Sequence, residues 1–132
     1  MNTLKIVLPF PAAKLNPNRR GGRSWQATAD EKAEAVQVGK IATLEALEGK
    51  HPVIATPVKF SVTFYCPDHR RRDIDNLLAS LKPSLDGIAN ATGIDDSVIE
   101  EMQLLKRYDL SNPRVEVNIP VMPPFGGEFE RK

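Results

Sequence analysis

Alternating apolar and polar positions predict the strands of this chain. Residues 3–10, TLKIVLPF, and residues 57–66, PVKFSVTFYC, each place every second side chain on one apolar side. The apolar side consists of Leu4, Ile6, Leu8 and Phe10 in the first segment and of Val58, Phe60, Val62, Phe64 and Cys66 in the second. Residues 100–109 and 114–120 indicate two further strands, joined by a turn at residues 111–113.

Two other segments have helical periodicity. Thr28 and Glu31 form a capping box that predicts the start of a helix, and Gly49 supplies a stop. Between them, apolar residues recur at helical spacing at Ala35, Val38, Ile41, Ala42 and Leu44. A second helix is predicted over residues 76–93 and is interrupted by Pro83. Because proline lacks the N–H that would bond the carbonyl of Ala79, we expect a kink there, or two short helices.

The resulting order, β-α-β-α-β-β, predicts an α+β domain: a small mixed sheet with helices packed on one face. A length of 132 residues fits one domain, which we assign to residues 1–120, with a flexible tail over 121–132. A composition of 41% hydrophobic and 27% charged residues is that of a soluble globular protein, and no apolar run is long enough to span a membrane. Cys66 is the only cysteine, which excludes an internal disulfide and favours the cytoplasm.

Charge is distributed unevenly along the chain. Residues 1–29 carry five basic side chains and no acid, whereas the remainder carries thirteen basic and seventeen acidic groups. Arg19, Arg20 and Arg23 precede Trp25 in a Pro- and Gly-rich segment. This segment reads equally well as a solvated loop or as an arm that contacts phosphates and stacks an aromatic ring on DNA.

The segment PDHRRRDIDN, residues 67–76, has the densest charge in the chain. Asp73 and Asp75 would point the same way in an extended segment, and two converging carboxylates favour a divalent cation; oxygen ligands suit Mg²⁺, with Mn²⁺ as the alternative. The three arginines, 70–72, would compete with that cation unless a phosphodiester lay between them, so the pattern suggests metal-assisted phosphoryl transfer. The alternatives are a helix-capping role for the aspartates and a solvated basic run.

Asp95 and Asp96 form a second acidic pair, after the second predicted helix. A straight helix over residues 76–91 would separate the two pairs by about 24 Å, too far for one site. A break at Pro83 could bring them together; the alternative is that the pair forms a turn and the start of a short helix. Lys82 could add a positive group near the phosphate, or it could simply be solvated.

Taken together, these motifs resemble the RusA family of Holliday junction resolvases. The resemblance covers PDHRRRDIDNL, the Lys82-to-Asp86 spacing, GIDDSVIEE and the N-terminal LPFPAAKLNPNRRGGR, from residue 3 to about 119. One departure is that some members carry the lysine four residues after the second aspartate, where this chain has Ala79.

The resemblance implies a Mg²⁺-dependent, homodimeric endodeoxyribonuclease of bacterial or phage origin that resolves four-way junctions by paired nicks. It implies Asp73, Asp75 and Asp96 as catalytic metal ligands, Lys82 as the functional lysine, and Asp86 and Asp95 as supporting acids, with Asp95 a further candidate metal ligand. No membrane and no small-molecule cofactor is expected. Arg19, Arg20, Arg23, Arg70, Arg71 and Arg72 are the candidate DNA contacts.

Three hypotheses remain from the sequence. The first is the junction-resolving nuclease, and the second is a nuclease for branched or flap DNA without strict junction preference. The third is a non-catalytic DNA-binding protein in which the acids serve as caps. The acidic residues argue against the third hypothesis, because binding alone gains nothing from carboxylates that face phosphate.

Overall fold

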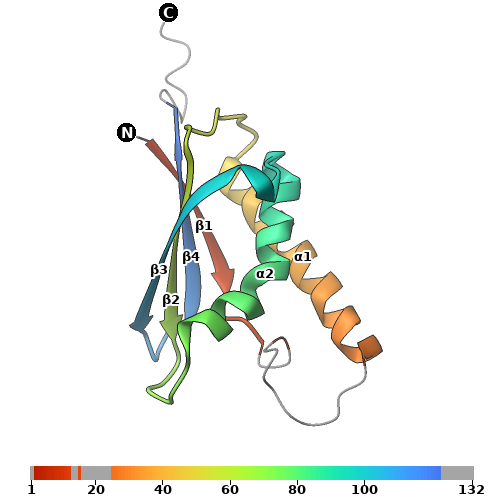
Figure 1. The fold of residues 1–132 in the computed structure, drawn as a ribbon, viewed down its shortest axis with the longest axis vertical. Coiled ribbons are helices and arrows are strands. Elements are labelled where there is room, and N and C mark those ends of the chain that lie inside the picture. Colours follow the sequence, from red (N-terminus) through yellow and green to blue (C-terminus); the bar gives the residue numbers. More distant parts are fainter. Residues whose placement is uncertain (1, 13–14, 16–24, 123–132) are drawn as a thin grey trace, which may run out of the picture.

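The four strands and two long helices follow the predicted order in the computed structural model, which describes residues 2–12, 15 and 25–122 (Figure 1). The strands are β1 (Asn2–Pro9), β2 (Val58–Cys66), β3 (Ile99–Tyr108) and β4 (Arg114–Val121). The helices are α1 (Trp25–Leu47), α2 (Ile74–Thr92) and the short 3-10 helix η2 (Asp96–Val98). β4 continues to Val121, a buried residue one position beyond the predicted end of the domain, and residues 123–132 lie outside the described part.

The sheet is mixed, as predicted. Its strand order is β1-β4-β2-β3, with β4 antiparallel to both of its neighbours and β2 parallel to β3. Val58 pairs with Ile99 and Cys66 pairs with Tyr108, so β2 and β3 run side by side over their whole length. The segment that leaves β2 and the segment that enters β3 therefore lie at opposite ends of the sheet, with α2 between them (Figure 1).

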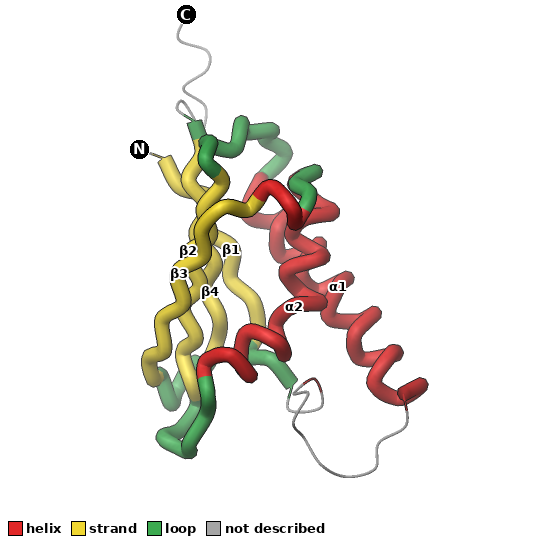
Figure 2. Tube along the Cα trace, in the orientation of Figure 1, coloured by secondary structure: helices red, strands yellow, loops and turns green. Residues whose placement is uncertain are grey.

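Both helices cover one face of this sheet, and the hydrophobic core lies between the two layers (Figure 2). The alternation predicted for the first two strands is confirmed within β1 and β2, whose inward residues are buried, none of them above 6% exposure. Phe10, predicted on the same side of the first segment, lies beyond the end of β1 and is only partly buried against the core. Cys66 is fully buried among the inward residues of β2, and burial raises the pKa of its thiol. It is thus a small core residue, as expected.

The helix α1 differs from the prediction at its start and on its inward face. It begins at Trp25, so Thr28 lies within the first turns and is not the capping residue. Ile41 and Leu44, two of the predicted apolar positions, are more than half exposed, whereas Gly39, Thr43 and Leu47 are buried. At Gly39, α1 packs so closely on α2 that a larger side chain would not fit, because an added Cβ would lie 2.1 Å from the carbonyl oxygen of Ser84.

The helix α2 is one continuous element that contains Pro83, so the alternative of two separate helices is wrong. Figures 1 and 2 show that its first turns run in a different direction from the remainder, which agrees with the expected kink. Leu77, Leu81 and Ile88 are buried at helical spacing against the sheet. The helix ends at Gly93, whose φ of 78° is left-handed and whose N–H donates to the carbonyl of Ala89.

Candidate active site

Asp73 and Asp75 lie where β2 has ended and α2 begins. Asp73 occupies the N-cap position in extended backbone (φ −84°, ψ 136°), but its side chain makes no capping hydrogen bond. Asp75 lies in the first helical turn, so the DID segment is not extended throughout; one carboxylate oxygen accepts the N–H of Asn76 at 3.0 Å. The Asp73 side chain is 57% exposed. The capping interpretation therefore does not account for its carboxylate, which remains open to a cation or to solvent.

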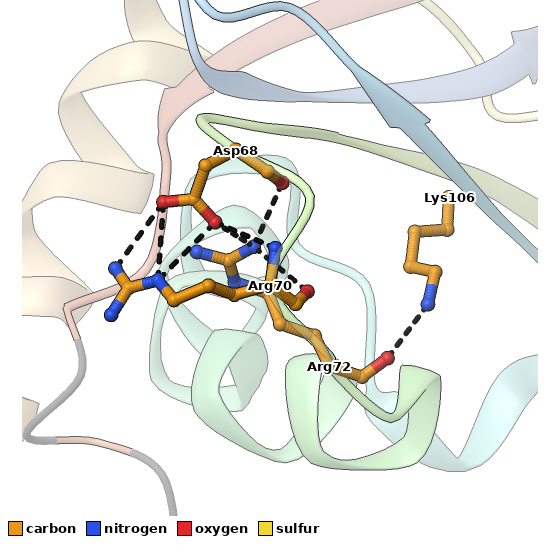
Figure 3. Close-up of polar contacts among 4 residues, drawn as sticks. All are labelled: Asp68, Arg70, Arg72 and Lys106. Atoms are coloured by element: carbon orange, nitrogen blue, oxygen red, sulfur yellow. Dashed lines mark hydrogen bonds and ion pairs between the residues drawn. The ribbon is translucent and has the colours of Figure 1, made fainter.

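The arginine run is organised by Asp68, an acid of the same segment that was not among the predicted site residues (Figure 3). Its carboxylate accepts the Arg70 N–H at 3.0 Å, lies 3.3 Å from Nε of Arg70 and forms an ion pair with Arg72 at 2.9 Å. Arg72 also donates to the carbonyl oxygen of Asp68 at 3.1 Å. The hydrogen bonds from Arg72, and then those from Arg70, hold the pKa of Asp68 well below its usual range.

The three arginines consequently differ in how exposed their guanidinium groups are and in how closely they are paired with acids. The Arg72 side chain is only 17% exposed, and its guanidinium lies 5.5 Å from the centre of the Phe10 ring. Arg71 is 93% exposed, and its ion pair with Asp73 is long, at 3.9 Å. A surface pair of this length contributes little stability and is readily exchanged for another anion. Arg71 is therefore the arginine of the run that is most available to phosphate.

A second unpredicted residue reaches this segment from the sheet. Lys106 of β3 donates from Nζ to the backbone carbonyl of Arg72 at 2.7 Å (Figure 3). Arg72 directly precedes Asp73, so this hydrogen bond fixes the backbone one residue before the candidate ligand. Nothing local in the sequence marks Lys106, because its partner lies 34 residues away and meets it only through the pairing of β2 with β3.

A groove of about 440 Å³ opens beside these groups. Its walls come from the segment after β1, the loop after β2 and the first turns of α2. The lining includes Phe10, Arg70, Arg71, Arg72, Asp73, Asn76 and Ser80. Guanidinium groups and a carboxylate thus share one concave surface, which suits a phosphodiester held by cations on both sides.

The second acidic pair lies at the other end of α2 (Figure 1). The 19 residues of that helix cover about 28 Å along its path, so one chain does not bring Asp73 and Asp96 together. Across the described residues, no group of three or more His, Cys, Asp or Glu side chains is placed to hold a metal ion. Asp95 accepts the backbone N–H of Ser97 at 3.1 Å just before η2, which confirms the turn interpretation for this residue.

The other predicted site residues are distributed as follows. Lys82 and Asp86 are exposed on α2, and Lys82 lies about two turns, or 10 Å, beyond Asp75. Arg19, Arg20 and Arg23 lie outside the described residues. At the groove, the Asp73 carboxylate lies beside the arginines, and Asp75 is exposed two residues further along. These carboxylates fit Mg²⁺, which is commonly held by one or two carboxylates together with substrate phosphate and water.

An α+β domain with a carboxylate and arginines in one groove has the composition expected of a metal-assisted phosphodiesterase, and comparison with known proteins identifies the family. Residues 9–120 match the family described as Endodeoxyribonuclease RusA. The chain belongs to this family and is an endodeoxyribonuclease.

Relatives with the name crossover junction endodeoxyribonuclease RusA align with nearly the whole chain. The protein of Enterobacteria phage 82 is 30% identical over 92% of this chain and 98% of its own length. That of Escherichia coli strain K12 is 29% identical with the same coverage. A solved structure, the periplasmic domain of Helicobacter pylori MotB, aligns with a TM-score of only 0.38 at 15% identity over 87% of this chain and 79% of its own, which supports no conclusion. Among the described residues, no helix is long and apolar enough to cross a membrane.

Proposed function

We propose that this protein is a Mg²⁺-dependent homodimer that resolves four-way DNA junctions by paired nicks. The observation that carries the proposal is the groove in which the exposed carboxylate of Asp73 lies beside Arg71. The names of the RusA relatives supply the substrate class, a crossover junction. A junction of four arms has approximate two-fold symmetry, so a two-fold dimer would present two identical sites for two matched cuts.

The separation of the acids along α2 supports a dimer for a second reason. If Asp96 serves the same metal as Asp73 and Asp75, it must come from another chain, because about 28 Å of helix separates them within one chain. Two copies of α2 that run antiparallel about a two-fold axis would bring the first turn of each helix beside the η2 helix of the other. Each dimer would then contain two composite sites.

The residues of the groove have separate tasks in this proposal. Asp73 and Asp75 would hold Mg²⁺, with Asp96 of a second copy as the third carboxylate. When bound, the cation would activate water and stabilise the charge that develops on the phosphate. Arg71, which lies beside Asp73, would bind the phosphodiester next to the cation. Lys82, two turns further along α2, would contact the backbone of the same strand.

The first test compares the wild type with Asp75→Asn on a synthetic four-way junction in Mg²⁺. We expect the wild type to make symmetric nicks and the variant to bind without cutting, because its binding surface loses only a negative charge that faces phosphate. Cutting by the variant at the wild-type rate would contradict the site assignment. Preference of the wild type for a flap or linear duplex would instead favour a branched-DNA nuclease.

A mixed-dimer experiment tests the composite site. Asp75→Asn and Asp96→Asn should each be inactive alone, and a dimer with one chain of each should regain nicking in one strand. In such a dimer, one composite site carries both substitutions and the other carries neither. If each site were contained in one chain, both sites of the mixed dimer would be defective and no nicking would return.

A further inference from the structure

We propose that Asp68 and Lys106 are positioning residues: together they fix the backbone of the loop 67–73 so that Asp73 is presented to the metal. This inference rests on the proposed role of Asp73 as a metal ligand. It adds two residues that touch neither the metal nor the scissile phosphate and that act from two different elements, the loop itself and β3.

Asp68 contributes the contacts within the loop. It binds the side chain and the backbone N–H of Arg70 and the side chain of Arg72, so one carboxylate ties together positions 68, 70 and 72. The contact with Arg72 matters most, because that guanidinium is only 17% exposed and is held against Phe10. The Arg70 side chain is 81% exposed, so its own ion pair adds little.

Lys106 contributes the contact between the loop and the sheet. Its Nζ donates to the carbonyl of Arg72 at 2.7 Å, in a partly buried setting. A hydrogen bond from a charged donor is roughly twice as strong as one between neutral groups. Arg72 is therefore held by its side chain through Asp68 and by its main chain through Lys106, and the next residue in the chain is Asp73.

The main chain of Asp73 is also held by the first hydrogen bond of α2, in which the Leu77 N–H donates to the Asp73 carbonyl at 3.1 Å, but its side chain is weakly held by the residues that the structure describes. It makes no capping hydrogen bond, and its contact with Arg71 is 3.9 Å long. Outer residues that orient a metal ligand typically account for a 10–100-fold change in metal affinity when they are removed. Loss of either contact should therefore lower the affinity for the cation more than the affinity for DNA.

The test uses the full-length protein with Asp68→Asn and Lys106→Met, and matched controls from equivalent contacts elsewhere. Asp109→Asn removes an acid that binds Arg114 at 2.8 Å on another loop, and Lys59→Met removes a strand lysine that pairs with Glu101 at 3.7 Å. Three quantities are measured for each variant: Mn²⁺ affinity without DNA, amide hydrogen exchange of residues 69–74, and junction affinity without metal.

We expect Asp68→Asn and Lys106→Met to weaken Mn²⁺ binding about tenfold and to speed exchange in residues 69–74. Junction affinity should be unchanged or higher for Asp68→Asn, because a negative charge near phosphate is lost, whereas general unfolding would lower it. Asp68→Glu should restore part of the Mn²⁺ affinity, and both controls should match the wild type.

The positioning role would be overturned if both test variants kept the Mn²⁺ affinity and the amide hydrogen exchange of the wild type. It would also be overturned if the controls lost as much Mn²⁺ affinity as the test variants. Failure of the proposed function has a different signature. If the wild type does not cut junctions while Mn²⁺ binding still depends on Asp68 and Lys106, the positioning role stands and the substrate assignment falls.

Discussion

The crossing of α1 and α2 gives a prediction in which two physical effects have opposite signs. Gly87 of α2 lies against the backbone of α1: a Cβ added there would be 2.1 Å from the carbonyl oxygen of Val36 and 2.7 Å from the backbone nitrogen of Lys40. The contact is reciprocal, because a Cβ on Gly39 would be 2.1 Å from the carbonyl oxygen of Ser84. Gly87→Ala therefore requires the two helices to move apart.

Helix propensity alone predicts that Gly87→Ala stabilises the protein by about 1 kcal/mol. Packing predicts the reverse. An ordinary contact begins at 3.4 Å, so a separation of 2.1 Å calls for a shift of about 1.3 Å between two backbones that cannot rotate out of the way. Overpacking of this kind costs about 1–3 kcal/mol, and rigid obstacles favour the upper end. We expect a net loss of about 2 kcal/mol, or roughly 6–10 °C in Tm for a domain of this size.

Urea and thermal unfolding followed by circular dichroism measure this loss. Asn90→Ala is the matched control, because it is an exposed position of the same helix where only propensity acts, and it should be neutral or slightly stabilising. Gly39→Ala should be destabilised to a similar degree. If Gly87→Ala is as stable as the wild type or more so, the two helices can move apart at little cost, and the predicted packing penalty is refuted.

Two further predictions concern single side chains. Arg71→Ala should weaken junction binding, reduce the slope of log affinity against log salt by about one, and leave Tm unchanged, because Arg71 is 93% exposed and is proposed to contact one phosphate; an unchanged slope would remove it from the DNA surface. Cys66 is buried with a raised pKa, so a thiol reagent should label it slowly in native protein even above pH 9 and rapidly in urea. Equal labelling rates would show that the end of β2 opens readily.

Much of the fold follows from periodicity alone. The inward faces of β1 and β2 are read directly from the alternation of apolar residues, since a pleated strand sends successive side chains to opposite faces. The element order follows from the switches between strand and helix periodicity. For α1 the same reasoning selected Ile41 and Leu44, which the structure leaves exposed. The inward face of α1 depends on how closely α2 approaches it, and a small residue such as Gly39 does not stand out in the hydrophobic pattern.

The sequence by itself determined that Asp73 and Asp75 lie beside three arginines at the junction of a strand and a helix, because those residues are neighbours in the chain. Only the tertiary structure decided which arginines are paired with Asp68, which one is most exposed, and which residues hold the loop 67–73. The contact between Lys106 and Arg72 spans 34 residues and depends on the parallel register of β2 and β3. The same register places the second acidic pair at the opposite end of the sheet, so the parallel topology agrees with the length of α2 in keeping the two pairs apart within one chain.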